Sequence, residues 1–272
     1  MTGKTDPAEP GEPAGSAGER RAGRNVVARP RDDLAGVVDL VVGSGSRRNA
    51  LTGDDWTDLA GACAELGTDE TLRAVVVRGT GGTFSAGSDM REWVSAEPAD
   101  VDDSFARMES AFTAIERLPV PVVAQVDGTA AGAGCQLALA CDLRILGESA
   151  RIGMPIARLG ILASPAFAAR ISLLTGPAVA RELLYTGRLL TAEQAVRVGL
   201  ANRSVPEDGL TETTTALVRS IVRHPPAALR AAKHAVSVGT DAALDAARAA
   251  GDGPSVAFPD FHRAVSAFLH RD

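Results

Sequence analysis

Two turns built from small residues constrain this chain more than any other feature of its sequence. They occupy residues 84–90 (FSAGSDM) and 127–136 (DGTAAGAGCQ). Each follows an apolar run typical of a strand, at 74–77 and at 121–126, and each leads into residues with helical periodicity. This arrangement aims the backbone N–H groups of both turns at one point. Reinforced by the positive end of a helix, such donors can hold a carbonyl oxygen as it becomes negative.

The composition is that of an ordinary globular protein, with 272 residues, 45% of them apolar and 23% charged. The formal charge is −6, and the basic residues form only short pairs such as 20–21 and 47–48. These features predict neither a nucleic-acid partner nor an anionic membrane surface. No apolar run approaches the ~20 residues of a membrane span, and the N-terminus has no secretory apolar core. We therefore expect a cytoplasmic protein.

The residues that usually hold metals or nucleotides are not arranged to do so. Cys63, Cys135 and Cys141 have no C-x-x-C spacing and are expected to be free thiols that fill the core. The four histidines all lie in the C-terminal third and form no metal motif. The stretch 132–134 (GAG) lacks the third glycine of a dinucleotide-binding turn, and neither a phosphate-binding loop nor a G-x-S-x-G elbow occurs. We expect no metal and no nucleotide cofactor.

The order of predicted elements indicates a mixed α/β fold. Residues 1–30 contain few apolar residues and are predicted to form a disordered extension. A strand at 37–42, a helix between a Thr52 cap and Gly67, and a strand at 72–78 follow. Further strands are predicted at 121–126 and 142–146, and helices at 101–117, 166–174, 177–184, 191–198, 210–223, 225–238 and 259–270. We therefore predict an α/β core with largely parallel strands over 31–195, followed by a helical C-terminal region over 196–272.

The two turns resemble the signature segments of the crotonase superfamily, the enoyl-CoA hydratase/isomerase family. Those patterns run roughly F-x-A-G-x-D-(hydrophobic) and N-G-x-A-x-G-G-G-x-E-L. The likeness extends to 48–51 (RNAL), to 183–200 and to 259–269, in the right order and spacing. Such a resemblance implies a crotonase (ClpP-like) spiral of ββα units. It also implies that the helical C-terminal region forms trimers, which can pair into hexamers.

The same resemblance implies a substrate and a site. The substrate would be an acyl thioester of CoA, or of an acyl carrier protein, with no cofactor beyond the CoA of the substrate. Its thioester oxygen would lie between the backbone N–H groups of Ser88 and Ala133. Ala133 replaces the usual glycine but keeps the N–H. Each such donor is worth ~3–4 kcal/mol of activation free energy when an enolate or tetrahedral oxyanion forms.

Substrate-binding positions carry over from the family in the same way. They are Arg48, Ala50, Ala86, Asp89, Met90, Gly134 and Ile156. Arg47 or Arg48 would meet a phosphate of CoA, with plain surface charge as the alternative. Asp89 and Asp142 also match family positions, and we predict capping and turn roles for these two carboxylates because short acids at helix starts usually have them.

Two departures from the family bear on the reaction. A hydratase of this family uses two glutamates, and Gln136 and Ile156 stand at their positions. General acid and base groups contribute ~10² to 10⁴ each in rate, so ordinary hydration and simple double-bond isomerisation are disfavoured. The candidate helpers are Gln136, Arg158, which would grip a substrate carboxylate, and Ser164. Their plain alternatives are a surface position for Arg158 and a helix cap for Ser164.

An oxyanion hole without these acids still permits several reactions. Decarboxylation of a malonyl-type thioester, thioester hydrolysis and carbon–carbon bond chemistry all pass through an oxyanion that two N–H groups stabilise. We therefore expect a lyase or isomerase with non-standard catalytic residues. Two other hypotheses stay open. One is a non-catalytic subunit for acyl-CoA binding or assembly, and the other is an RNA-binding relative, against which the acidic balance argues.

Overall fold

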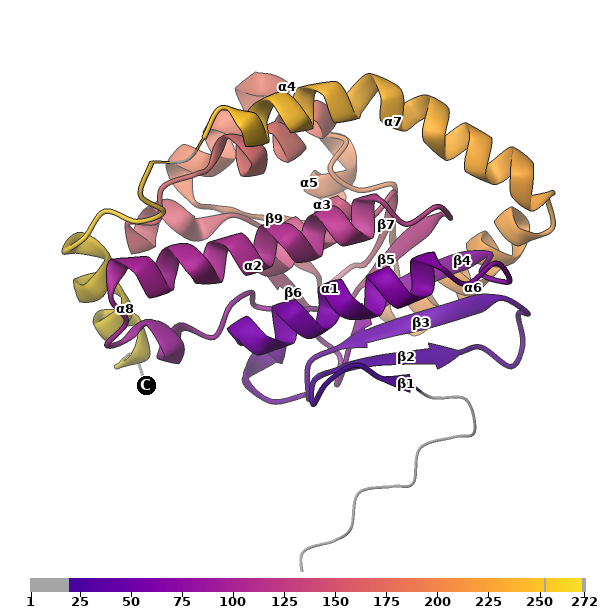
Figure 1. The fold of residues 1–272 in the computed structure, drawn as a ribbon, viewed down its shortest axis with the longest axis horizontal. Helices are drawn as coiled ribbons and strands as arrows, with labels where there is room; N and C mark the ends of the chain where they lie inside the picture. Colours follow the sequence, from indigo (N-terminus) through magenta and orange to yellow (C-terminus); the bar gives the residue numbers. More distant parts are fainter. Residues whose placement is uncertain (1–19, 252, 271–272) are drawn as a thin grey trace, which may run out of the picture.

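The computed structural model describes residues 20–251 and 253–270. Its main feature is a sheet of seven strands, and Figure 1 shows helices flanking this sheet. The sheet has the strand order β1-β2-β3-β4-β5-β7-β10. Its parallel strands are β3 (Val37–Val42), β4 (Ala74–Gly79), β5 (Val122–Val126), β7 (Leu143–Gly147) and β10 (Arg203–Val205). At one edge, β2 (Val26–Pro30) and β1 (Arg20–Arg21) pair antiparallel.

The central strands are buried on both faces, which explains their runs of valine. In β4, Val75 and Val77 face a core shared with α1 (Gly53–Gly67) and α2 (Pro98–Glu116). Ala74 and Val76 face the opposite side, where α6 (Leu210–Val222) covers the sheet with Leu210 and Val218. Figure 1 shows α1 and α2 lying together across one face. The predicted parallel α/β core is confirmed.

A second, three-stranded sheet lies beside the main one. It consists of β6 (Thr129–Ala131), β8 (Arg151–Gly153) and β9 (Leu189–Thr191), and it was not predicted. Strand β6 forms inside the second small-residue turn, and α3 (Ala133–Ala140) starts two residues after it. Three residues are too few to show an alternating pattern, so only pairing with β8 reveals this strand.

The predicted helices are present with shifted ends. The described C-terminal helices are α4 (Pro165–Thr186), α5 (Ala192–Arg197), α6, α7 (Pro226–Ala249) and α8 (Asp260–Leu269). The two helices predicted at 166–174 and 177–184 form the single element α4, interrupted at Gly176, where φ is 77°. Helix α8 packs on two short 3-10 turns, η2 (Met90–Trp93) and η3 (Pro155–Leu159). Two further 3-10 turns are η1 (Arg47–Asn49) and η4 (Glu207–Gly209).

Two predicted boundaries are wrong. Residues 20–30, assigned to a disordered extension, form β1 and β2, because Val26, Val27 and Ala28 bury themselves against β3. The rest of that predicted extension, residues 1–19, lies outside the described residues. The boundary at 195 cuts through α5 and separates β10 and α6 from the sheet that they complete. Within the described part of the chain, no helix is long and apolar enough to cross a membrane.

Candidate active site

The two small-residue turns, distant in the sequence, are in direct contact. Ser85 pairs with β6 in a short parallel bridge: its N–H donates to Thr129 O at 2.8 Å, and its carbonyl accepts from Ala131 N at 3.1 Å. At Gly134, in the first turn of α3, a Cβ atom would lie 2.1 Å from Ser85 O. The helix can therefore approach this closely only because position 134 has no side chain.

The Ser88 peptide is held between two hydrogen bonds to one residue. Leu51 N donates to Gly87 O at 2.8 Å, and Asp89 N donates to Leu51 O at 2.8 Å. Because peptide groups alternate in direction along extended backbone, the N–H of Ser88 itself points away from Leu51. Within the described residues it has no hydrogen-bond acceptor. Position 88 thus offers a fixed and uncommitted main-chain donor.

The N–H of Ala133 is the second such donor. Ala133 is the first residue of α3, and the first bond of this helix runs from Gln136 N to Gly132 O at 3.1 Å. The N–H groups that precede Gln136 therefore have no partner within the helix, and they carry the positive end of its dipole. A Cβ atom on Gly87 would lie 3.0 Å from Ala133 N, so the residue before Ser88 borders the Ala133 N–H. The first turn therefore passes directly beside the start of α3.

The Ser88 hydroxyl takes no part in this arrangement. Trp56 Nε1 donates to Ser88 Oγ at 3.3 Å, and Ser88 Oγ donates to Met108 Sδ at 2.9 Å. Both partners are buried in the core between α1 and α2. The side chain of position 88 therefore anchors the turn to the helices, and its backbone N–H stays the predicted donor.

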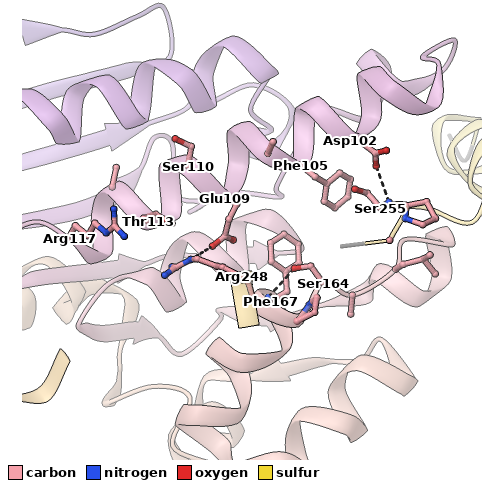
Figure 2. Close-up of a pocket in the computed structure, with 18 residues that line it drawn as sticks. Asp102, Phe105, Glu109, Ser110, Thr113, Arg117, Ser164, Phe167, Arg248 and Ser255 are labelled. Atoms are coloured by element: carbon pink, nitrogen blue, oxygen red, sulfur yellow. Dashed lines mark hydrogen bonds and ion pairs between the residues drawn. The ribbon is translucent and has the colours of Figure 1, made fainter. Parts of the chain in front are cut away.

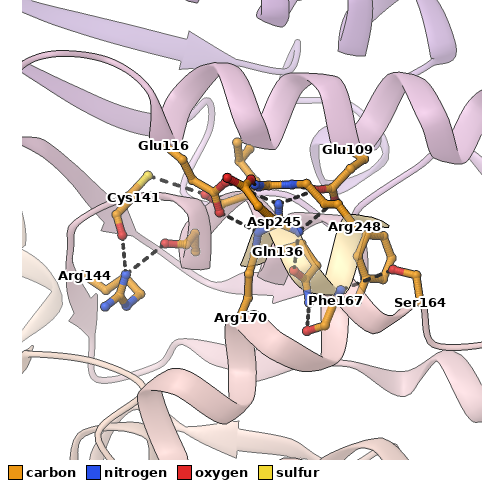
Figure 3. Close-up of polar contacts among 12 residues, drawn as sticks. Glu109, Glu116, Gln136, Cys141, Arg144, Ser164, Phe167, Arg170, Asp245 and Arg248 are labelled. Atoms are coloured by element: carbon orange, nitrogen blue, oxygen red, sulfur yellow. Dashed lines mark hydrogen bonds and ion pairs between the residues drawn. The ribbon is translucent and has the colours of Figure 1, made fainter. Parts of the chain in front are cut away.

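Gln136 is fully buried and its amide is used inside the protein (Figure 3). Nε2 donates to Phe167 O at 3.3 Å and lies 3.7 Å from Met154 Sδ. Oε1 accepts from Arg170 Nη1 at 3.4 Å. The side chain predicted to assist the substrate thus joins α3 to α4 instead.

Arg170 belongs to a buried ion cluster that the sequence analysis did not detect. Its guanidinium lies 2.6 Å from Glu109 and 2.7 Å from Glu116, and Arg248 contacts the same two carboxylates. Burial alone would raise the pKa of Glu109, but hydrogen bonds and charge from Arg170 and Arg248 outweigh it and lower that pKa. Two glutamates seven residues apart on one face of α2 were the available signal. Their partners come from α4 and α7, far along the chain.

Three further residues were considered for a part in the reaction: Ile156, Ser164 and Arg158. Ile156 is buried in η3 as part of the main core. Ser164 is the N-cap of α4, where its Oγ accepts from Phe167 N at 3.2 Å. Arg158, also in η3, is exposed. The capping alternative for Ser164 and the surface alternative for Arg158 are confirmed.

Asp89 has the capping role predicted for it. As N-cap of η2, its Oδ1 accepts from Arg91 N at 3.2 Å. It also forms ion pairs with Arg91 at 2.8 Å and Arg47 at 3.4 Å. Burial raises its pKa, and the charge of Arg47 opposes that rise. Asp142 has the predicted turn role, accepting from Val122 N at 2.7 Å.

The other predicted binding positions form the rim of the first turn. Arg48 O accepts from Ala86 N at 2.8 Å, and Ala50, which follows η1, donates to Arg47 O at 3.2 Å. Met90 starts η2 and is half-buried. Both arginines considered for a phosphate are exposed. Arg47 also lies 3.4 Å from Asp89, with which it forms an ion pair.

An elongated cavity of about 870 Å³ lies along α2, opposite the start of α4 (Figure 2). Of the predicted catalytic and substrate-binding residues, only Ser164 lines it. Phe105 and Phe167, whose ring centroids are 6.1 Å apart, form its apolar wall. Phe112 lies 6.1 Å from Phe167 and 5.4 Å from Trp56, whose Nε1 donates to Ser88 Oγ, so a row of aromatic rings links the cavity wall to the first turn. Within the described residues, no group of three His, Cys, Asp or Glu side chains is placed to hold a metal.

Comparison with known proteins assigns the family. The family model described as "Enoyl-CoA hydratase/isomerase" matches residues 35–262. An "Enoyl-CoA isomerase/hydratase fer4" of Mycosarcoma maydis is 34% identical over 78% of this chain and 81% of its own length. The "2,3-dehydroadipyl-CoA hydratase" of Escherichia coli K12 is 32% identical over 86% of this chain and 92% of its own length.

Solved structures agree with this assignment. An enoyl-CoA hydratase from Bacillus anthracis superposes with a TM-score of 0.77 at 28% identity over 92% of both chains. Another, from Mycobacterium avium subsp. paratuberculosis, has a TM-score of 0.80 at 26% identity, covering 91% of this chain and 96% of that one. The predicted crotonase fold is confirmed. This chain belongs to the enoyl-CoA hydratase/isomerase family of the crotonase superfamily.

Proposed function

We propose that this protein binds an acyl-CoA thioester and stabilises its enolate with the N–H groups of Ser88 and Ala133, in a reaction other than ordinary hydration. One observation carries the proposal. Within the described residues, neither Ser88 N nor Ala133 N has a hydrogen-bond acceptor, Gly87 lies beside Ala133 N, and positions 136 and 156 hold no acid. The N–H donors that would stabilise an oxyanion are thus present, whereas the acids that would transfer protons are missing.

Decarboxylation shows how such a site would work. In a malonyl-type thioester, the electrons of the breaking carbon–carbon bond move into the thioester carbonyl as carbon dioxide leaves. The negative charge then develops on the oxygen between Ser88 N and Ala133 N, and no base is needed. The α-carbon of the enolate afterwards takes a proton from water. Thioester hydrolysis and carbon–carbon bond chemistry use the same two donors, each worth ~10² to 10³ in rate.

The two glutamates that Arg170 connects to Gln136 are poorly suited to replace the missing pair. Glu109 and Glu116 are tied to Arg170 and Arg248, and the lowered pKa of Glu109 makes it a weak base. Several relatives are named as hydratases, so a hydratase is the second candidate. A non-catalytic acyl-CoA-binding subunit is the third.

A panel of thioesters separates these candidates. Purified protein is incubated with saturated, α,β-unsaturated, malonyl-type and hydroxyacyl thioesters of CoA and of a carrier protein, and products are identified by mass spectrometry. We expect turnover of a substrate whose enolate forms without a protein base. Rapid hydration of crotonyl-CoA would instead establish the hydratase. Binding of CoA without any turnover would establish the binding subunit.

Restoring both acids should create hydration. In the double variant Gln136→Glu with Ile156→Glu, the first carboxylate would lie beside Arg170, which stabilises its charged form. We expect crotonyl-CoA hydration to rise at least ~10²-fold over the native protein, the contribution of one general acid or base. The matched control is Gln136→Glu with Ile156→Gln, which keeps the side-chain size without the second acid. Equal rates of crotonyl-CoA hydration in the two double variants would show that position 156 does not face the substrate.

We further propose that the chain assembles as a homotrimer, alone or paired into a hexamer. Large apolar side chains are exposed on α7 and α8, among them Val236, Val238 and Phe268. An exposed apolar helix face is typical of a subunit contact. Sedimentation equilibrium should give three or six times the chain mass of 28.0 kDa.

A further inference from the structure

The turn before the oxyanion hole has an unusual backbone. Arg47, Arg48 and Asn49 have φ angles of 48°, 53° and 55°. Three consecutive residues with side chains thus adopt the left-handed conformation, which L-amino acids disfavour. Such strain persists only where the surrounding structure enforces it, and it concentrates at functional sites.

The side chain of Asn49 enforces this conformation. It is completely buried, and its Oδ1 accepts from Gly45 N at 2.8 Å. Its Nδ2 donates to Thr80 O and Thr83 O, both at 2.8 Å, and to Phe84 O at 3.3 Å. One amide therefore connects the loop after β3 with the loop after β4, directly before the first small-residue turn.

The backbone of the strained turn passes this connection on to Ser88. Asn49 O accepts from Ser85 Oγ at 2.8 Å, and Ser85 Oγ in turn accepts from Gly87 N at 3.1 Å. Two residues after Asn49, Leu51 makes the pair of hydrogen bonds that flanks the Ser88 peptide. The two main-chain bonds that flank the Ser88 N–H thus lead back to the segment that Asn49 holds.

Position 49 needs an amide that both donates and accepts hydrogen bonds, and it needs a residue that tolerates a positive φ. No side chain other than asparagine meets both requirements. Aspartate has the same shape but cannot donate to three carbonyls. Glutamine is longer, and the site is closed on the side of Gly43, where a Cβ would lie 2.3 Å from Asn49. Glycine accepts the positive φ but has no amide. Asparagine is also among the residues that best tolerate this φ.

We infer that Asn49 is the positioning residue of the oxyanion hole: it fixes the direction of the Ser88 N–H without touching the substrate. The inference rests on the proposed function, because it assigns the cause of a geometry that matters only if Ser88 N binds the thioester oxygen. Misplacing a catalytic donor by about 1 Å costs on the order of 10²-fold in rate.

Acetoacetyl-CoA tests this role without knowledge of the natural reaction. Its enolate absorbs in the near ultraviolet, so titration of absorbance against pH gives the apparent pKa of the bound thioester. Affinity for free CoA, measured in parallel, reports on the rest of the binding site. The variants are Asn49→Asp, Asn49→Gly and the milder Ser85→Ala, which removes only the bridging hydroxyl. Thr214→Ala, at a fully buried position in α6, controls for loss of stability.

Native protein and the Thr214 variant should bind the enolate of acetoacetyl-CoA in clear preference to the neutral form. In both Asn49 variants we expect that preference to fall ~10-fold or more, as for a partly misplaced donor. Affinity for free CoA should stay nearly native. The Ser85 variant should lie in between. If all folded variants kept the native preference for the enolate, the role of Asn49 would be overturned and the proposed oxyanion hole would stand. Absence of any preference in native protein would overturn the oxyanion hole and, with it, the role of Asn49.

Discussion

At the scale of single residues, Gly87 joins the two halves of the candidate site. Its φ of 99° is one that side-chain-bearing residues rarely adopt, and a Cβ there would lie 2.8 Å from Ala131 O and 3.0 Å from Ala133 N. The absence of a side chain therefore does two things at once. It permits the turn, and it leaves the Ala133 N–H open.

Gly87→Ala should weaken enolate stabilisation, because the added methyl group would lie 3.0 Å from Ala133 N and crowd that donor. We expect a loss of at least ~10² in turnover, the value of one oxyanion donor. Initial rates with the best thioester of the panel measure it. The control is Gly61→Ala in α1, where nothing lies within 4 Å of the added Cβ. That change should raise the free energy of unfolding by about 0.5–1 kcal/mol and leave the rate unchanged. A native rate in the Gly87 variant would remove Ala133 N from the site.

The contrast between Ser88 and Gln136 shows what residue-level prediction can do. The predicted role of Ser88 depends on its backbone, and the pattern of small residues predicted two turns that the structure brings into contact. The role of Gln136, in contrast, depends on the groups that surround its side chain. Its partners, Arg170 and the carbonyl of Phe167, lie in α4 and follow from no local pattern.

At the scale of elements, α3 presents its start to the site and its end to a buried cation. Arg144 donates to Cys141 O at 2.5 Å, Ala138 O at 3.4 Å and Leu200 O at 2.7 Å. Burial lowers the pKa of this arginine, although nearby charges oppose the shift. A cation at the carbonyl end satisfies the last peptide groups and matches the helix dipole. The helix that carries the Ala133 N–H is thus held at both ends.

The ion cluster of Glu109, Glu116, Arg170 and Arg248 ties α2, α4 and α7 together (Figure 3). Arg170 is only 3% exposed, so its charge depends on the two carboxylates. Replacing one partner of a buried pair leaves the other uncompensated and is strongly destabilising. We regard this cluster as the link between the core and the C-terminal helices.

Glu109→Gln should make stability less dependent on pH. The folded-state pKa of Glu109 lies below its ordinary value of 4.5, so the carboxylate stabilises the fold at pH above that value. This contribution is lost as pH falls through the folded-state pKa. We expect the variant to lose about 1.5–3 kcal/mol at pH 7, the worth of a hydrogen bond to a charged group, and the difference from native protein to shrink in acid.

Urea denaturation between pH 3 and pH 8 measures this difference. Glu193→Gln is the control, because Glu193 pairs only with exposed Arg197 within α5 and should change stability little. A constant difference between native protein and the Glu109 variant at all pH values would contradict the assigned pKa direction.

At the scale of the whole molecule, the sheet needs its N-terminal edge. Val26, Val27 and Ala28 of β2 are buried against β3, and β2 pairs with residues 38–42 of that strand. Without it, β3 would become an exposed, valine-rich edge strand, which is a template for aggregation.

A chain that starts at residue 31 should therefore be less stable than the full chain and prone to aggregate. The two buried valines alone contribute ~1.5–3 kcal/mol each. Urea midpoints and the soluble fraction at equal expression provide the measurement. A truncated protein that stays soluble with an unchanged midpoint would show that β2 is dispensable, as a disordered extension would be.

The sequence by itself determined the family, the parallel α/β core and the two turns, because each follows from local rules. Valine runs make strands, helical periodicity makes helices, and small residues between them free the N–H groups of Ser88 and Ala133. Tertiary structure alone decided the partners of Gln136, the hold of Asn49 on the first turn, and the place of residues 20–30 in the sheet. These features depend on contacts between segments far apart in the chain, whose free energy no local pattern records.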